Sequence, residues 1–134
     1  MMIFDLETDG LLNDLTCIHC LVIHNTDDNK TLIFNDQGNE ESIVNGITLL
    51  EGSDCIVGHN IIGYDNCAIR KCYPFYEPQG RIIDTLLLSR LYHPDLMKKD
   101  KIQPNKFMPL QLYGRHSLEA WGYRLKEYKG CFSK

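Results

Sequence analysis

Two carboxylates near the start of the sequence are the residues whose types and spacing most directly suggest chemistry. Asp5 and Glu7 follow the apolar residues Ile3 and Phe4 and stand two positions apart. Side chains at this spacing in a strand point to the same face, about 6 to 7 Å apart along the chain, so both can reach one cation. Their mutual repulsion would be relieved by a hard divalent metal ion. The same spacing is frequent on surface strands, so the pair alone does not establish a site.

A third carboxylate arrives in the segment GHNIIGYD, residues 58–65, which directly follows the apolar strand expected at residues 55–57. Catalytic groups often sit on loops at the carboxyl ends of strands. We therefore expect His59 and Asn60 at the rim of a sheet, and Asp65 beside Asp5 and Glu7. The alternative is that Asp65 is only a helix N-cap, and without the first two carboxylates that interpretation would be preferred.

The elements that must position these residues follow from apolar periodicity and turn signals. Three strands forming an antiparallel meander are expected first, followed by alternating helices and strands. The order βββαβαβα predicts an α/β fold, a ribonuclease H-like mixed β-sheet flanked by helices. The expected strands span 1–6, 16–24, 30–35, 55–57 and 82–83, and the expected helices span 40–50, 86–92 and 116–128. Residues 60–73 are expected to begin as a loop and continue as a helix, and residues 98–114 to form an exposed loop.

Two residues outside these motifs receive structural interpretations. Asp84 is expected to cap the helix at 86–92. Trp121 has core spacing with Leu118 and Leu125 in the last helix.

Acidic and basic residues are distributed unevenly along the sequence. Residues 1–97 hold 5 Lys and Arg against 15 Asp and Glu, whereas residues 98–134 hold 9 against 3. An acidic, cation-binding part is thus followed by a basic part that can meet phosphates. The alternative is that the lysines form a solvated loop with no partner.

The six cysteines are expected to be free and to serve as small buried hydrophobes. Cys17 and Cys20 would point to opposite faces of a strand, and no second C-x-x-C completes four zinc ligands. No apolar run approaches the roughly 20 residues of a membrane span, and the first residues lack a basic signal-peptide region. We expect one intracellular domain over residues 1–134, with no membrane partner.

The motifs carry a resemblance. Asp5-x-Glu7 resembles the first exonuclease motif of the DnaQ-like (DEDD) nucleases, and Asn60 to Asp65, preceded by His59, resembles the second. The segments IDTLLLSRL at 83–91 and HSLEAWGYRL at 116–125 are similar to parts of the family A DNA polymerases of T-odd phages. The resemblance extends over essentially all 134 residues. It implies a proofreading-type 3′→5′ exonuclease domain in a bacterial or phage-infected cell.

The resemblance also implies a site. Asp5, Glu7 and Asp65 would hold two Mg²⁺ or Mn²⁺ ions about 3.5 to 4 Å apart and catalyse phosphodiester hydrolysis. The substrate would be the 3′ end of single-stranded DNA, bound through sequence-tolerant contacts. Its expected contacts are Leu6, Thr8, His59, Asn60 and Tyr64.

The sequence departs from the family pattern in one respect. The resemblance implies a fourth carboxylate from a third motif, and only Tyr123 and Glu127 imitate it weakly. We therefore expect one strong metal site and slow hydrolysis unless a second polypeptide completes the site. The alternatives are an inactive fold that binds metal or single-stranded DNA, and an interaction module. An uncovered apolar surface would favour a homodimer.

Overall fold

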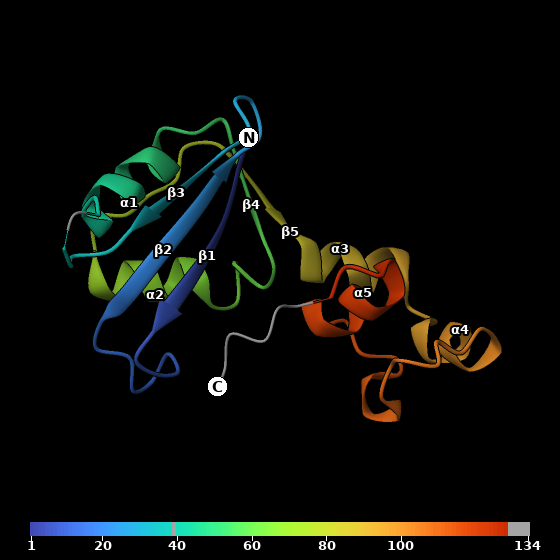
Figure 1. The fold of residues 1–134 in the computed structure, drawn as a ribbon. Helices are drawn as coiled ribbons and strands as arrows, with labels where there is room; N and C mark the ends of the chain where they lie inside the picture. Colours follow the sequence, from blue (N-terminus) through green and yellow to red (C-terminus); the bar gives the residue numbers. More distant parts are fainter. Residues whose placement is uncertain (39, 129–134) are drawn as a thin grey trace. The chain divides into compact units, whose positions relative to one another are not determined.

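The structure is a computed structural model that describes residues 1–38 and 40–128 (Figure 1). Its contacts divide the chain into two compact units, Met1–Thr85 and Leu86–Lys134. None of the described helices is long and apolar enough to cross a membrane. The expectation of one exonuclease domain over residues 1–134 stays a prediction.

The first unit is built on a five-stranded mixed sheet. The strands lie in the order β3-β2-β1-β4-β5. The pairs β1·β2 and β2·β3 are antiparallel, whereas β1·β4 and β4·β5 are parallel. This mixed sheet with its flanking helices is the ribonuclease H-like α/β fold expected from the sequence, and the predicted meander is confirmed. The elements are β1 (Met2–Thr8), β2 (Ile18–Asn25), β3 (Lys30–Phe34), α1 (Ile43–Glu51), β4 (Cys55–Gly58), α2 (Asp65–Cys72) and β5 (Arg81–Asp84).

One face of the sheet carries the core. Phe4 and Leu6 of β1 are buried together with residues of β2, α1 and α2, so both helices cover the same face. Asp5 and Glu7 alternate with these residues and are exposed on the other face. The prediction that the two carboxylates share one face of a strand is confirmed.

The second unit is helical. Its elements are α3 (Thr85–Tyr92, beginning at the last residue of the first unit), α4 (Leu96–Ile102), the 3-10 helix η1 (Leu110–Leu112) and α5 (Leu118–Leu125). The prediction of an exposed loop over 98–114 was therefore wrong where α4 and η1 form. The last helix is also shorter than predicted, since the Ser117 hydroxyl caps its start and Lys126 ends it in the left-handed conformation with φ 62°.

A buried ion pair explains why α4 forms. Leu96 and Asp100, four positions apart, are the buried residues of this helix. Arg124 donates from Nε to Asp100 Oδ1 at 3.0 Å and from its terminal nitrogen to Oδ2 at 2.7 Å. The backbone of Gly114 donates to the same carboxylate at 2.8 Å. These three hydrogen bonds satisfy a carboxylate that would otherwise be costly to bury.

Trp121 does not pack as the spacing suggested. Leu118 and Leu125 are 57% and 64% exposed, so their predicted core role with Trp121 was wrong. The indole instead lies 5.1 Å from the His93 ring and 5.1 Å from the Arg124 guanidinium. Its Nε1 donates to Ser89 Oγ at 2.7 Å.

The cysteines were predicted as buried hydrophobes, and this is confirmed for Cys55 alone among those described. Cys17 is exposed and the remaining three are partly buried. Each of the five is a free thiol. Cys131 lies outside the described residues.

Candidate active site

The topology of the sheet brings the motifs together. β4 runs parallel to β1 with Ile3 paired to Val57, so the carboxyl ends of both strands lie at one edge. The chain then passes through residues 58–64 and enters α2, whose first residue is Asp65. Gly58 makes the close passage possible, because a Cβ there would lie 2.2 Å from Ile61 Cγ2 and 3.0 Å from the Phe4 carbonyl.

Asp65 is the buried acid of the site, with only 4% of its surface exposed. Burial and, to a smaller extent, the negative charges of Asp5 and Asp84 raise the pKa of this carboxyl to about 7. Backbone hydrogen bonds involving Asp65 itself and Leu6 oppose the shift. The structure therefore brings Asp65 and Asp5 together, as the motif spacing suggested, with a repulsion that a proton or a cation relieves.

Glu7 is the third candidate carboxylate of the site. It is exposed on the same face as Asp5. Within residues 1–38 and 40–128, no three His, Cys, Asp or Glu side chains gather closely enough to hold a metal ion as they stand. The metal-binding role of Asp5, Glu7 and Asp65 stays a prediction.

Hydrogen-bonding contacts of the Thr8 and Tyr64 hydroxyls connect the end of β1 with the start of α2. Thr8 Oγ1 lies 2.5 Å from the Tyr64 hydroxyl, and both contact the Gly10 carbonyl, at 3.1 and 2.6 Å. The Thr8 and Tyr64 hydroxyls thus have two protons between them for these three contacts. Both residues were predicted to bind substrate. In this structure their hydroxyls position the strand carrying Asp5 against the helix carrying Asp65.

Replacing Tyr64 with phenylalanine should therefore destabilise the protein by about 1 kcal/mol, because one part-buried hydroxyl network loses a member. The measurement is the urea midpoint of unfolding. Tyr92→Phe is the control, since that side chain is 69% exposed. Equal midpoints for the two variants would show that the hydroxyl of Tyr64 contributes nothing to the fold.

The loop between β4 and α2 is held by Asp84, which sequence reasoning assigned to a helix cap. Its carboxylate accepts the backbone N–H of Asn60 at 2.8 Å and of Ile62 at 3.0 Å, while its role as a helix cap stays a prediction. Asn60 adopts φ 66°, a left-handed conformation that needs such support in a residue other than glycine. Asp84 is 5% exposed and is a positioning residue that the sequence reasoning missed.

His59 is held by a second missed residue, Thr85. His59 Nδ1 lies 2.9 Å from Thr85 Oγ1, which donates to the Gly58 carbonyl at 3.2 Å. With the threonine proton on that carbonyl, the imidazole donates from Nδ1. Only the sequence proximity of Asp84 and Thr85 to a strand end hinted at these roles.

Leu6, also predicted to contact substrate, is 7% exposed and packs in the core. Its side chain does not share the face of Asp5 and Glu7, so any nucleotide contact at this position would come from the backbone. The predicted substrate contacts stay predictions for all five residues, Leu6, Thr8, His59, Asn60 and Tyr64.

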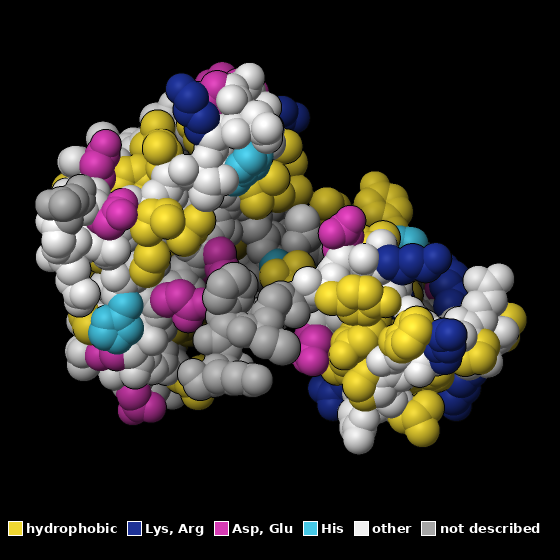
Figure 2. All heavy atoms as spheres, in the orientation of Figure 1, with side chains coloured by type: hydrophobic (Ala, Val, Ile, Leu, Met, Phe, Trp, Pro, Cys, Tyr) yellow, Lys and Arg dark blue, Asp and Glu magenta, His cyan; other side chains and the backbone are white. Residues whose placement is uncertain are grey.

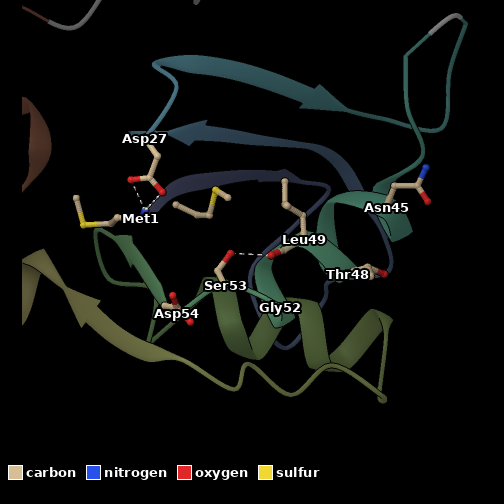
Figure 3. Close-up of a pocket in the computed structure, with 9 residues that line it drawn as sticks. Met1, Asp27, Asn45, Thr48, Leu49, Gly52, Ser53 and Asp54 are labelled. Carbon is tan, nitrogen blue, oxygen red and sulfur yellow. Dashed lines mark hydrogen bonds and ion pairs between the residues drawn. The ribbon is translucent and has the colours of Figure 1, made fainter.

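A pocket of about 610 Å³ lies at the other end of β1 (Figure 3). Ser53 Oγ donates to the Leu49 carbonyl at 2.7 Å on its wall. None of the predicted site residues lines it, so the carboxylates stand on the open sheet face and not in this hollow. It is lined by Met1, Met2, Asp27, Asn45, Thr48, Leu49, Gly52, Ser53 and Asp54.

This chain is similar in sequence to the DNA-directed DNA polymerases of two phages. The chain is 34% identical over 139 aligned positions to the DNA-directed DNA polymerase of Enterobacteria phage T3, and 35% identical over 140 to that of Escherichia phage T7. Each alignment covers 97% of this chain and 20% of the polymerase, so the chain spans about a fifth of these relatives. No family model matches.

Among solved structures, the chain resembles the family B DNA polymerase from the hyperthermophilic archaeon Pyrobaculum calidifontis. The TM-score is 0.46 with 14% sequence identity, covering 94% of this chain and 22% of that one.

Proposed function

Because this chain is related to a segment of the DNA-directed DNA polymerases of phages T3 and T7, we propose that it is a metal-dependent 3′→5′ exonuclease domain. The substrate is the 3′ end of single-stranded DNA. Hydrolysis adds water across the terminal phosphodiester and releases a nucleoside 5′-phosphate.

The observation that carries this proposal is the approach of Asp65 to Asp5. A carboxyl that is 4% exposed lies at the carboxyl ends of two neighbouring parallel strands, where burial and the charge of Asp5 raise its pKa to about 7. Such strongly shifted carboxyls cluster at functional sites. A hard divalent cation favours the ionised form of both groups, so the donor set fits Mg²⁺ or Mn²⁺.

Asp5, Glu7 and Asp65 are the residues that would hold the ions. When bound, divalent metal supplies a Lewis acid that polarises the phosphodiester and activates water. The remaining residues hold the segments that carry these carboxylates. Asp84 fixes the loop that leads to Asp65, and the Thr8 and Tyr64 hydroxyls hold that loop to β1. His59 and Asn60 belong to the same loop and would lie beside the bound DNA strand.

The alternative is a module that binds single-stranded DNA or a protein partner without hydrolysis. It is favoured by the observation that, in the part of the chain the structure describes, no three candidate ligands gather around one point. The two functions share the fold and differ in whether the carboxylates act on phosphodiesters.

The test is degradation of a 5′-labelled single-stranded oligonucleotide with Mg²⁺ or Mn²⁺. We expect a ladder shortened from the 3′ end that EDTA abolishes and that is absent for the Asp5→Ala, Glu7→Ala variant. The control variant Asp14→Ala, Glu77→Ala removes two exposed carboxylates and should retain the ladder.

A ladder of equal strength in the Asp5→Ala, Glu7→Ala variant would reveal a contaminating nuclease. No ladder from the unsubstituted protein, together with retained binding of the oligonucleotide, would favour the binding module.

A further inference from the structure

The charges of the chain separate between its two compact units. The unit Met1–Thr85 holds 4 Lys and Arg against 14 Asp and Glu, whereas Leu86–Lys134 holds 10 against 4. Figure 2 shows most of the Lys and Arg side chains in view on the second unit. Since a nucleic acid is a polyanion, the first unit repels it at long range. Most of the side-chain cations that can attract phosphates therefore belong to the second unit.

Two of the four acids of the second unit form ion pairs with cations of the same unit. Asp95 pairs with Lys99 at 3.0 Å, and Asp100 pairs with Arg124 at 2.7 Å. Residues 101–118 contain neither Asp nor Glu. Within residues 1–38 and 40–128, no ion pair joins a carboxylate to the exposed cations that remain on this part of the unit, Lys98, Lys101, Lys106 and Arg115.

The geometry of α4 directs two of these cations outward. Leu96 and Asp100 are its buried residues, so they define its inner side. Lys98 and Lys101 are three positions apart, which makes them neighbours on the helix surface, and both are exposed. Arg124 holds Asp100 inside, so the carboxylate between them in sequence does not compensate their charge.

An aromatic ring accompanies the cations. Phe107 is 63% exposed, and Lys106 Nζ lies 4.8 Å from the centre of its ring. Exposed aromatic rings among lysines suit single-stranded nucleic acids, because bases stack on the rings while phosphates meet the cations. An acidic peptide would use the cations and leave the ring without a stacking partner.

We propose that Lys98, Lys101, Lys106 and Phe107 form a binding surface for single-stranded DNA, separate from the carboxylates of the first unit. The lysines contact phosphates, and Phe107 stacks on a base. The inference deepens the proposed function by naming the surface that attracts the substrate strand.

The test measures binding of a fluorescent, ~20-nucleotide single strand by anisotropy in EDTA, over a range of salt concentrations. The variant Lys98→Gln, Lys101→Gln, Lys106→Gln should bind at least about tenfold more weakly near 50 mM salt. Its slope of log affinity against log salt should fall by about 2, at roughly 0.7 for each lost phosphate contact. Phe107→Ala should weaken binding about fivefold or more with the slope unchanged, because stacking releases no counterions.

The matched control is Lys30→Gln, Arg70→Gln, Arg81→Gln, which removes three exposed cations from the first unit. It should change affinity less than about threefold. Circular dichroism melts establish that every variant folds. Equal weakening by this control, unchanged binding by the lysine variant, or preference for a polyglutamate peptide over the oligonucleotide would each overturn the proposal.

Failure of this surface is distinguishable from failure of the exonuclease. Binding in EDTA requires no hydrolysis. Turnover of the p-nitrophenyl ester of thymidine 5′-phosphate with Mn²⁺ reports on the carboxylates alone, and the lysine variant should retain it. A protein that binds through the lysines but never hydrolyses the ester would refute the exonuclease and leave the surface standing.

Discussion

Asp65→Asn should stabilise the metal-free protein at about pH 8 by on the order of 2 to 4 kcal/mol while abolishing the proposed hydrolysis. Burial and the charge of Asp5 raise the pKa of the Asp65 carboxyl to about 7 in the folded protein, above its usual value near 3.8. Ionising it therefore costs more in the folded chain than in the unfolded one. Asparagine keeps the shape of the protonated acid and carries no charge.

The effect depends on pH in a defined direction. Below about pH 4 the carboxyl is protonated in both states, so the two proteins should be equally stable. Between about pH 4 and pH 7 the unfolded chain ionises while the folded chain keeps its proton, so the unsubstituted protein loses stability as pH rises. Above about pH 7 the advantage of the variant should be constant.

The measurement is denaturant unfolding in EDTA at several pH values, followed by the same titration with Mn²⁺. Metal should stabilise the unsubstituted protein and leave the variant unchanged, because a ligand that binds only the native state raises its stability. Identical midpoints for both proteins at about pH 8 in EDTA would show that the fold does not oppose ionisation of Asp65.

Asp84→Ala should destabilise the protein by about 2 to 4 kcal/mol. The substitution leaves the backbone N–H groups of Asn60 and Ile62 without their carboxylate acceptor, and partly buried donors that lose their partner are costly. Relief of the repulsion between Asp84 and Asp65 offsets part of the loss. The loop that delivers Asp65 would relax from its left-handed turn, so activity should fall as well.

Urea unfolding measures this change, with Asp28→Ala as the control. The Asp28 carboxylate also accepts a backbone N–H, from Lys30 at 3.2 Å, but in an exposed turn where water replaces it. Its loss should cost less than about 1 kcal/mol. If both alanine variants unfold at the same urea concentration, Asp84 is not the residue that holds the loop.

Local periodicity predicted much of the first unit. Alternation in β1 placed Asp5 and Glu7 on one face, because side chains in a strand repeat every second residue. The meander and the strand leading into the Gly58 loop followed from apolar runs and turn residues. The approach of Asp65 to Asp5 depended further on β4 lying parallel beside β1, which the fold class implied.

Contacts between residues distant in sequence escaped prediction. Asp84 resembled a helix cap because it precedes a helix, and its bonds to the backbone of residues 22 and 24 positions earlier were not foreseen. The segment that forms α4 resembled a lysine-rich loop. Its helical form depends on the burial of Asp100, whose partner Arg124 follows 24 positions later. Spacing rules describe neighbours within a turn or strand and carry no information about such partners.

The burial of Asp65 has an evolutionary consequence. A carboxyl whose ionisation opposes folding lowers the mutational tolerance of the whole chain, since destabilising changes elsewhere have less margin. Selection for stability alone would replace it with asparagine, in which an amide nitrogen takes the place of one carboxylate oxygen. In any lineage that no longer depends on this site, Asp65 should therefore be among the first of its residues to drift, ahead of the exposed Asp5 and Glu7.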